Sequence, residues 1–154
     1  MRVVRQFFAG LVENALYSDV GVGSPEVVDY LSELLSTHLH INDLFPFKEN
    51  NRLISIDRLY NRARTKEMKR NTCRHVGDFA MFWTGLYPEN IKNLHSTGLG
   101  FSRKEFVRQG KKFYQMAAIN TASRQKPPAH ILEDLSTHFD DYCYGLSICR
   151  NDFK

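Results

Sequence analysis

Cysteine is scarce in this chain, and its pattern argues against a disulfide framework. Cys73, Cys143 and Cys149 are odd in number, and no two of them have the Cys-x-x-Cys spacing. Cys143 and Cys149 are six residues apart, which places them on different faces of a helix. We expect three reduced thiols and, because disulfides are rare in reducing compartments, a cytoplasmic location.

Long apolar runs are missing as well. No stretch approaches the roughly 18 apolar residues that mark a membrane-spanning helix. Arg2, Arg5 and Glu13 interrupt the partly apolar N-terminal stretch, and no small-residue cleavage site follows it. We therefore expect neither a signal peptide nor contact with a membrane.

The residues that are present are those of an ordinary globular domain. The chain has 154 residues, of which 42% are hydrophobic and 25% charged, and it is rich in Phe and Tyr, which can supply a large core. A domain of this length buries roughly 68–70% of its unfolded surface, so it needs no metal or disulfide to fold. We expect a single domain over residues 1–154.

Apolar residues recur at helical spacing along almost the whole chain. We predict an all-α fold, a compact single-domain bundle of five main helices plus one or two short ones. Ser24 followed by Pro25 and Glu26 marks one helix start, and Ser102 with Glu105 forms a capping box at another. The predicted helices cover residues 2–17, 25–40, 55–63, 76–87, 102–123 and 129–149, with a short turn at 88–94.

The most apolar of these helices, 76–87, begins beside a polar pair. On a helical wheel His75 projects at the angle of Phe82 and Leu86, inside the apolar arc, and Asp78 follows three residues later. A buried imidazole oriented by a carboxylate suits a general base or a metal ligand. It equally suits a structural histidine, because an unpaired polar group in a core is costly. His75 and Asp78 are therefore candidate catalytic or ligand-binding residues, with the structural interpretation left open.

The last predicted helix carries His130, Asp134 and His138, each one turn from the next. Two ligands one turn apart occur in helical zinc sites, so adjacent members of this set could share a metal. All three span too far along one straight helix to close around a single ion. Helix capping and surface ion pairs explain the same residues, and we expect no resident cofactor.

The net charge of +4 is concentrated in one segment. Residues 58–74 hold seven cations and a single acid, Glu67, so this segment carries +6 and the rest of the chain −2. From 64 to 74 the apolar stripe is lost, which leaves either a solvated helical extension or a mobile loop. Cations interleaved with Tyr60 could contact phosphates and stack a base, although such residues usually form a solvated helix face. The nucleic-acid candidates are Arg58, Arg62, Arg64, Lys66, Lys69, Arg70 and Arg74, with a second basic stripe at Lys104, Arg108 and Lys111.

Aromatic residues near the predicted loops are candidates for contact with a protein partner. They are Phe45, Phe47 and Tyr87. Aromatic side chains are enriched at the centres of interfaces, but they are also ordinary core residues.

Several sequence blocks resemble a family of bacterial helical proteins of unknown function. These blocks are HVGDF at 75–79, FWTGLYPE at 82–89, QGKK at 109–112 with Tyr114, and YGL at 144–146. The resemblance spans most of the chain and implies a bacterial origin and a cytosolic setting. It implies no activity.

These observations lead to three hypotheses of function. We expect a small non-enzymatic module for protein interaction or regulation, acting through a protein partner or as a homodimer. The alternative is a metal- or small-molecule-binding protein, with or without catalysis, centred on His75 and Asp78. The second alternative is nucleic-acid binding through residues 58–74. Whether the protein is an enzyme is left open.

Overall fold

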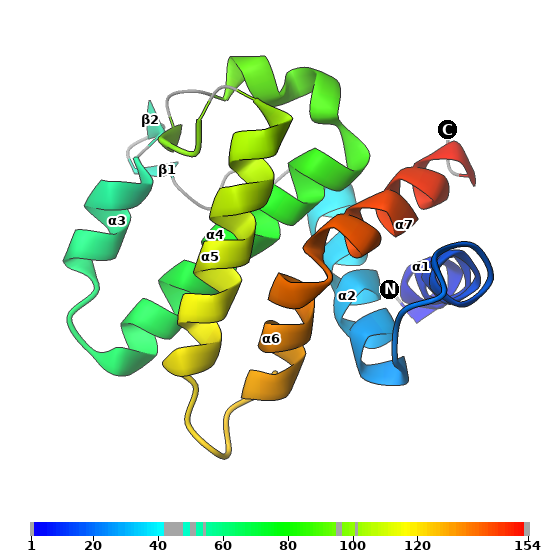
Figure 1. The fold of residues 1–154 in the computed structure, drawn as a ribbon, viewed down its shortest axis with the longest axis horizontal. Coiled ribbons are helices and arrows are strands. Elements are labelled where there is room, and N and C mark those ends of the chain that lie inside the picture. The colour runs from blue at the N-terminus through cyan, green and yellow to red at the C-terminus, as the bar shows by residue number, and fades with distance from the viewer. Residues whose placement is uncertain are drawn as a thin grey trace.

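The computed structural model describes residues 2–41, 48–49, 52–53, 55–94, 97–100 and 102–152, and it is all-α as predicted (Figure 1). Within these ranges the strands β1 (Lys48–Glu49) and β2 (Arg52–Leu53) form a short antiparallel pair. None of the described helices has the length and apolar character needed to cross a bilayer. The helical elements are α1 (Arg2–Asn14), the π-helical η1 (Ala15–Val20), α2 (Pro25–Ile41), α3 (Ile56–Arg62), α4 (Lys66–Leu86), the 3-10 helix η2 (Pro88–Asn93), α5 (Arg103–Ile119), α6 (Ala129–Thr137) and α7 (Phe139–Asp152).

Several helices begin where the sequence predicts. The Ser24 hydroxyl accepts a hydrogen bond from the Val27 amide at 3.2 Å, directly before Pro25 opens α2. The Ser102 hydroxyl accepts from the Glu105 amide, also at 3.2 Å, at the start of α5. These side chains satisfy amides that have no partner within the helix.

Helix α4 is the centre of the molecule. Every residue from Val76 to Leu86 is buried, because α5, α7 and α2 all pack against it. In Figure 1, α5 crosses in front of α4, and α1 and α2 lie on the side away from α3. Gly77 allows the close approach of α5, since a Cβ there would lie 2.6 Å from the Tyr114 ring. The predicted core helix is confirmed, although it is buried on all sides rather than over one arc.

The basic segment belongs to the same helix. Thr65 caps α4 by accepting a hydrogen bond from the Met68 amide at 3.1 Å, and the helix runs without interruption from Lys66. Of the two alternatives for residues 64–74, the helical extension is therefore the one adopted from Lys66 onward. On the inner face of this segment, Arg70 is only 3% exposed, and its guanidinium donates hydrogen bonds to Thr121 Oγ1 and to the Pro127 carbonyl.

The prediction of one continuous helix over 129–149 is wrong. The chain leaves helical geometry at His138, and α6 and α7 meet there at an angle (Figure 1). The break allows Phe139 to be fully buried, with its ring 6.0 Å from that of Tyr114 and against the backbone of Gly110. Local spacing could not predict this, because the apolar stripe continues on both sides of the break.

Candidate functional site

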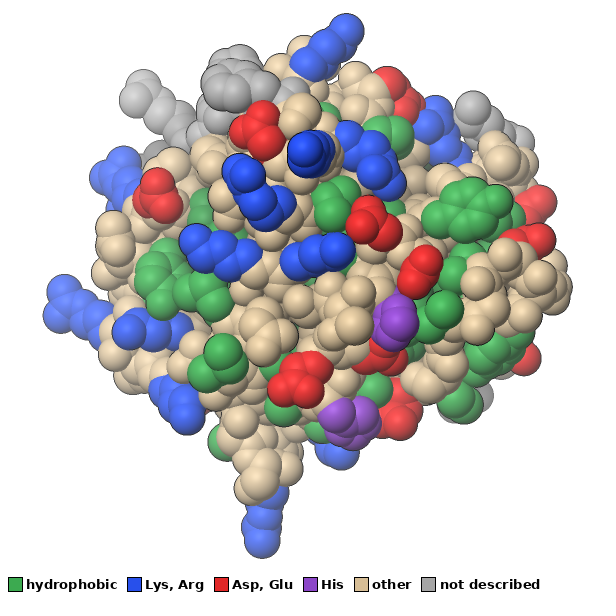
Figure 2. Space-filling model, in the orientation of Figure 1, with side chains coloured by type: hydrophobic (Ala, Val, Ile, Leu, Met, Phe, Trp, Pro, Cys, Tyr) green, Lys and Arg blue, Asp and Glu red, His purple; other side chains and the backbone are tan. Residues whose placement is uncertain are grey.

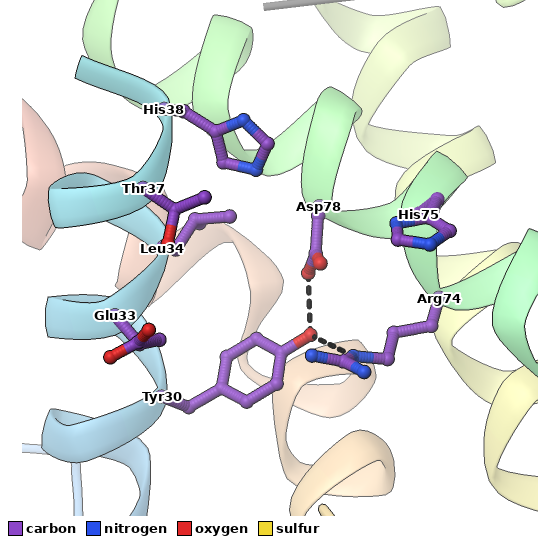
Figure 3. Close-up of a pocket in the computed structure, with 8 residues that line it drawn as sticks. All are labelled: Tyr30, Glu33, Leu34, Thr37, His38, Arg74, His75 and Asp78. Carbon is purple, nitrogen blue, oxygen red and sulfur yellow. Dashed lines mark hydrogen bonds between the residues drawn. The ribbon is translucent and has the colours of Figure 1, made fainter. Parts of the chain in front are cut away.

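A pocket of about 260 Å³ opens between α2 and α4, and we call it the α2–α4 pocket (Figure 3). Helix α2 contributes one wall and the middle of α4 the other, with side chains from both pointing into the space between them. Its lining residues are Tyr30, Glu33, Leu34, Thr37 and His38 from α2, and Arg74, His75 and Asp78 from α4.

The carboxylate of Asp78 is the buried polar centre of this pocket. Asp78 is 7% exposed, and its Oδ1 accepts hydrogen bonds from the hydroxyls of Tyr30 and Tyr114, both at 2.6 Å. Its Oδ2 has no hydrogen-bond donor among the described residues. A carboxylate has about four acceptor positions, so Asp78 keeps capacity for a further donor on the pocket side.

Arg74 extends this network. Its Nε donates to the Tyr30 hydroxyl at 3.0 Å, and its guanidinium lies 5.5 Å from the centre of the Tyr30 ring. Burial lowers the pKa of Arg74, but Tyr30 and Asp78 outweigh this effect and raise it overall, so the group stays charged. Burial, together with the charge of Asp78, raises the pKa of Tyr30 and Tyr114 well above 10.0, so both phenols remain protonated donors.

His75 is placed differently from the prediction. Its side chain is exposed at the rim of the pocket, and the partners of Asp78 are the two tyrosines. The wheel angle was misleading because it gives direction only, and in the middle of α4 that direction faces the opening toward α2. Partial desolvation at the pocket lowers the pKa of His75 below 6.5; Asp78 opposes this shift, and Arg74 and His38 reinforce it. The imidazole is therefore neutral at pH 7.

The metal candidates do not converge. His130 Nε2 lies 3.2 Å from Glu26 of α2, while Asp134 accepts the Tyr142 hydroxyl at 2.8 Å. His138, at the break between α6 and α7, has its Nδ1 3.2 Å from Asp141. No group of three potential ligands that could hold a metal occurs within the described ranges. Ion pairs and hydrogen bonds account for all three residues.

The nucleic-acid candidates are divided between surface and interior. Arg70 is buried and Arg74 is half-buried in the Tyr30 network at the pocket, so neither lies on the solvated helix face that a nucleic acid would contact. Lys69 lies 6.0 Å from the Tyr60 ring. Arg58, Arg62, Arg64 and Lys66 are exposed, and Figure 2 shows Lys and Arg side chains gathered over the α3 and α5 side of the molecule. The tertiary structure thus removes two of the seven cations from the predicted surface.

The aromatic candidates give little support to a partner surface. Phe45 and Phe47 lie outside the described residues. Tyr87 is half-buried, its ring packs against Phe82 and Trp83, and the Arg150 guanidinium lies 4.9 Å from its centre. This tyrosine is therefore part of the packing at the end of α4.

Sequence reasoning missed Tyr30 and Tyr114, which hold the central carboxylate. They are 48 and 36 residues from Asp78 along the chain, so no local spacing could have signalled them. His38 also lines the pocket, and its ring lies 5.8 Å from that of Phe82. No protein-family model, no curated protein and no solved structure matches this chain, so the resemblance to a bacterial helical family rests on its sequence blocks alone.

Proposed function

We propose that this protein is a non-enzymatic module that binds a small organic ligand in the α2–α4 pocket. The observation that carries the proposal is the buried Asp78 carboxylate, which lines the pocket: its Oδ1 is held by two tyrosines, and its Oδ2 has no donor among the residues that the structure describes. Oδ2 is not among the buried side-chain atoms without a partner, so it is accessible, and a charged acceptor there would form a strong hydrogen bond with a ligand donor.

A binding role is favoured over catalysis by the groups present. The described residues lining the pocket include no cysteine or serine, and all three thiols lie buried elsewhere in the core. The phenols that touch Asp78 have raised pKa values, which makes them hydrogen-bond donors rather than bases. The groups therefore suit recognition of a ligand.

Screening of a small-molecule library by thermal unfolding tests the proposal. A ligand at 100 times its Kd should stabilise the fold by about 2.7 kcal/mol. For a chain of this size that corresponds to a rise in Tm of about 5–10 °C. Hits should lose their effect on the variant Asp78→Asn.

Asp134→Asn is the matched control, because Asp134 also accepts a tyrosine hydroxyl, from Tyr142 at 2.8 Å, but lies outside the pocket. Hits should stabilise this variant as they do the unmodified protein. A library that gives no hit, or hits that act equally on Asp78→Asn, would contradict the proposal.

Binding of a protein partner, or of a second copy of the chain, is the second candidate function. Of the three aromatic residues predicted for this role, Tyr87 is the one that the structure describes. Since Tyr87 is half-buried under Arg150, this role has weaker support than ligand binding. Light scattering after size exclusion tests it: a defined dimer that dissociates in Tyr87→Ser would place partner binding first, and a monomer would count against it.

A further inference from the structure

We infer that the ligand of the α2–α4 pocket is a small zwitterion, an α-amino acid, with its amino group on Asp78 and its carboxylate on Arg74. This inference rests on the proposed function and specifies its ligand class. It starts from the presence of two opposite charges on one wall of the pocket, each with unused hydrogen-bonding capacity.

The two charges are joined through a single hydroxyl group. The Tyr30 hydroxyl donates to Asp78 Oδ1 at 2.6 Å and accepts from Arg74 Nε at 3.0 Å. The terminal nitrogens of Arg74 have no acceptor among the described residues, just as Asp78 Oδ2 has no donor. A donor site and an acceptor site therefore lie side by side, close enough for one small molecule to reach both. The amino and carboxylate groups of an α-amino acid are separated by one carbon atom, so such a molecule presents both groups to two neighbouring charges.

Charge balance favours a zwitterion over a simple cation or anion. Glu33, the other acid of the pocket, is paired with Arg5 Nε at 2.7 Å, and the imidazole of His75 is neutral at pH 7 because its pKa is lowered. Among the acidic residues and the arginine that line the pocket, this leaves Asp78 and Arg74, whose charges cancel. A plain amine would meet the like charge of Arg74, and a plain carboxylate would meet that of Asp78. A molecule bearing both groups satisfies each charge with its opposite.

The size of the pocket limits the rest of the ligand. Its volume of about 260 Å³ is below the range of roughly 300–1,000 Å³ that holds drug-sized molecules. Beyond the charged pair, the α2 wall offers Leu34, Thr37 and His38, which is a mixed surface with one aliphatic residue. We therefore expect an amino acid with a small or medium side chain.

Calorimetric titration with free amino acids tests the inference when each is compared with two matched analogues. One analogue is the amine that lacks the carboxylate, and the other is the acid that lacks the amino group. Each analogue should bind about 10- to 100-fold more weakly than the amino acid, because each loses one charge-assisted hydrogen-bonded contact. Asp78→Asn and Arg74→Gln should each weaken amino-acid binding by a similar factor, and Asp134→Asn should leave it unchanged.

The outcomes separate this inference from the proposed function. If an amine or an acid alone binds as tightly as the amino acid, and Asp78→Asn weakens that binding, the zwitterion is wrong and the pocket remains a binding site. If neither amino acids nor library compounds bind, both are wrong. Amino-acid binding that is unaffected by Asp78→Asn and Arg74→Gln also overturns the inference. Circular dichroism verifies that each variant is folded; should Asp78→Asn fail to fold, Arg74→Gln with the acid and amine analogues makes the same distinction.

Discussion

Replacing Gly77 by alanine tests how closely α4 and α5 pack beside the pocket. An added Cβ would lie 2.6, 2.7 and 2.8 Å from three carbon atoms of the Tyr114 ring, which is fully buried and cannot move aside freely. Displacement of that ring would also disturb its hydroxyl, which donates to Asp78 at 2.6 Å. The packing of the helices and the geometry of the pocket therefore depend on the same glycine.

The magnitude follows from three opposing effects. Alanine gains about 1 kcal/mol over glycine inside a helix. Overpacking a rigid core costs about 1–3 kcal/mol, and weakening a hydrogen bond to a buried charge costs about 1.5–3 kcal/mol. We expect Gly77→Ala to lower the free energy of unfolding by about 2–4 kcal/mol, or Tm by about 4–16 °C at this chain length.

Gly10→Ala is the matched control, because Gly10 lies inside α1 and an added Cβ meets nothing within 4 Å. The same substitution should raise the free energy of unfolding there by up to about 1 kcal/mol. Urea denaturation, followed by circular dichroism, measures both variants. Equal or greater stability of Gly77→Ala relative to the unmodified protein would refute the reasoning, and so would destabilisation by Gly10→Ala.

Three further predictions concern the buried polar groups. Tyr30→Phe removes the hydroxyl that joins Arg74 to Asp78 and should cost about 1–3 kcal/mol in urea denaturation; an unchanged midpoint would contradict it. The single ammonium of a lysine at position 70 cannot replace the guanidinium that donates to both the Thr121 hydroxyl and the Pro127 carbonyl. Arg70→Lys should therefore lower the free energy of unfolding by about 1.5–3 kcal/mol, whereas the exposed Arg64→Lys should leave it unchanged. Burial raises the pKa of Cys73 to about 11 and of Cys149 to about 12, and also raises that of Cys143, so a thiol reagent should label the native protein slowly and the unfolded protein fast. Unfolded thiols ionise near pH 9.0, whereas the buried native thiols stay neutral to higher pH. The stability that comes from burying the neutral Cys73 thiol is therefore complete below pH 9.0 and is lost as pH rises toward 11.

The sequence by itself determined the fold class, most helix boundaries and the central helix. Apolar spacing of 3.6 residues and the capping residues Ser24 and Ser102 act within a few residues of chain, so they can be recognised locally. The same local patterns identified Asp78 as a polar residue in an apolar helix. They also left residues 64–74 undecided, because that stretch has no continuous apolar stripe and its buried cation, Arg70, is satisfied by Thr121 and Pro127 from a distant part of the chain.

Only the tertiary structure decided what surrounds each of these residues. Asp78 is held by Tyr30 and Tyr114, which approach from other helices, while His75, three residues away on the same helix, is left at the rim of the pocket. The break at His138 likewise follows from the space that α5 offers to Phe139. A helical repeat specifies the direction of a side chain, but the group it meets there depends on which distant segment packs against that face. For this reason the candidate site changed from a histidine and a carboxylate to a carboxylate, two tyrosines and an arginine.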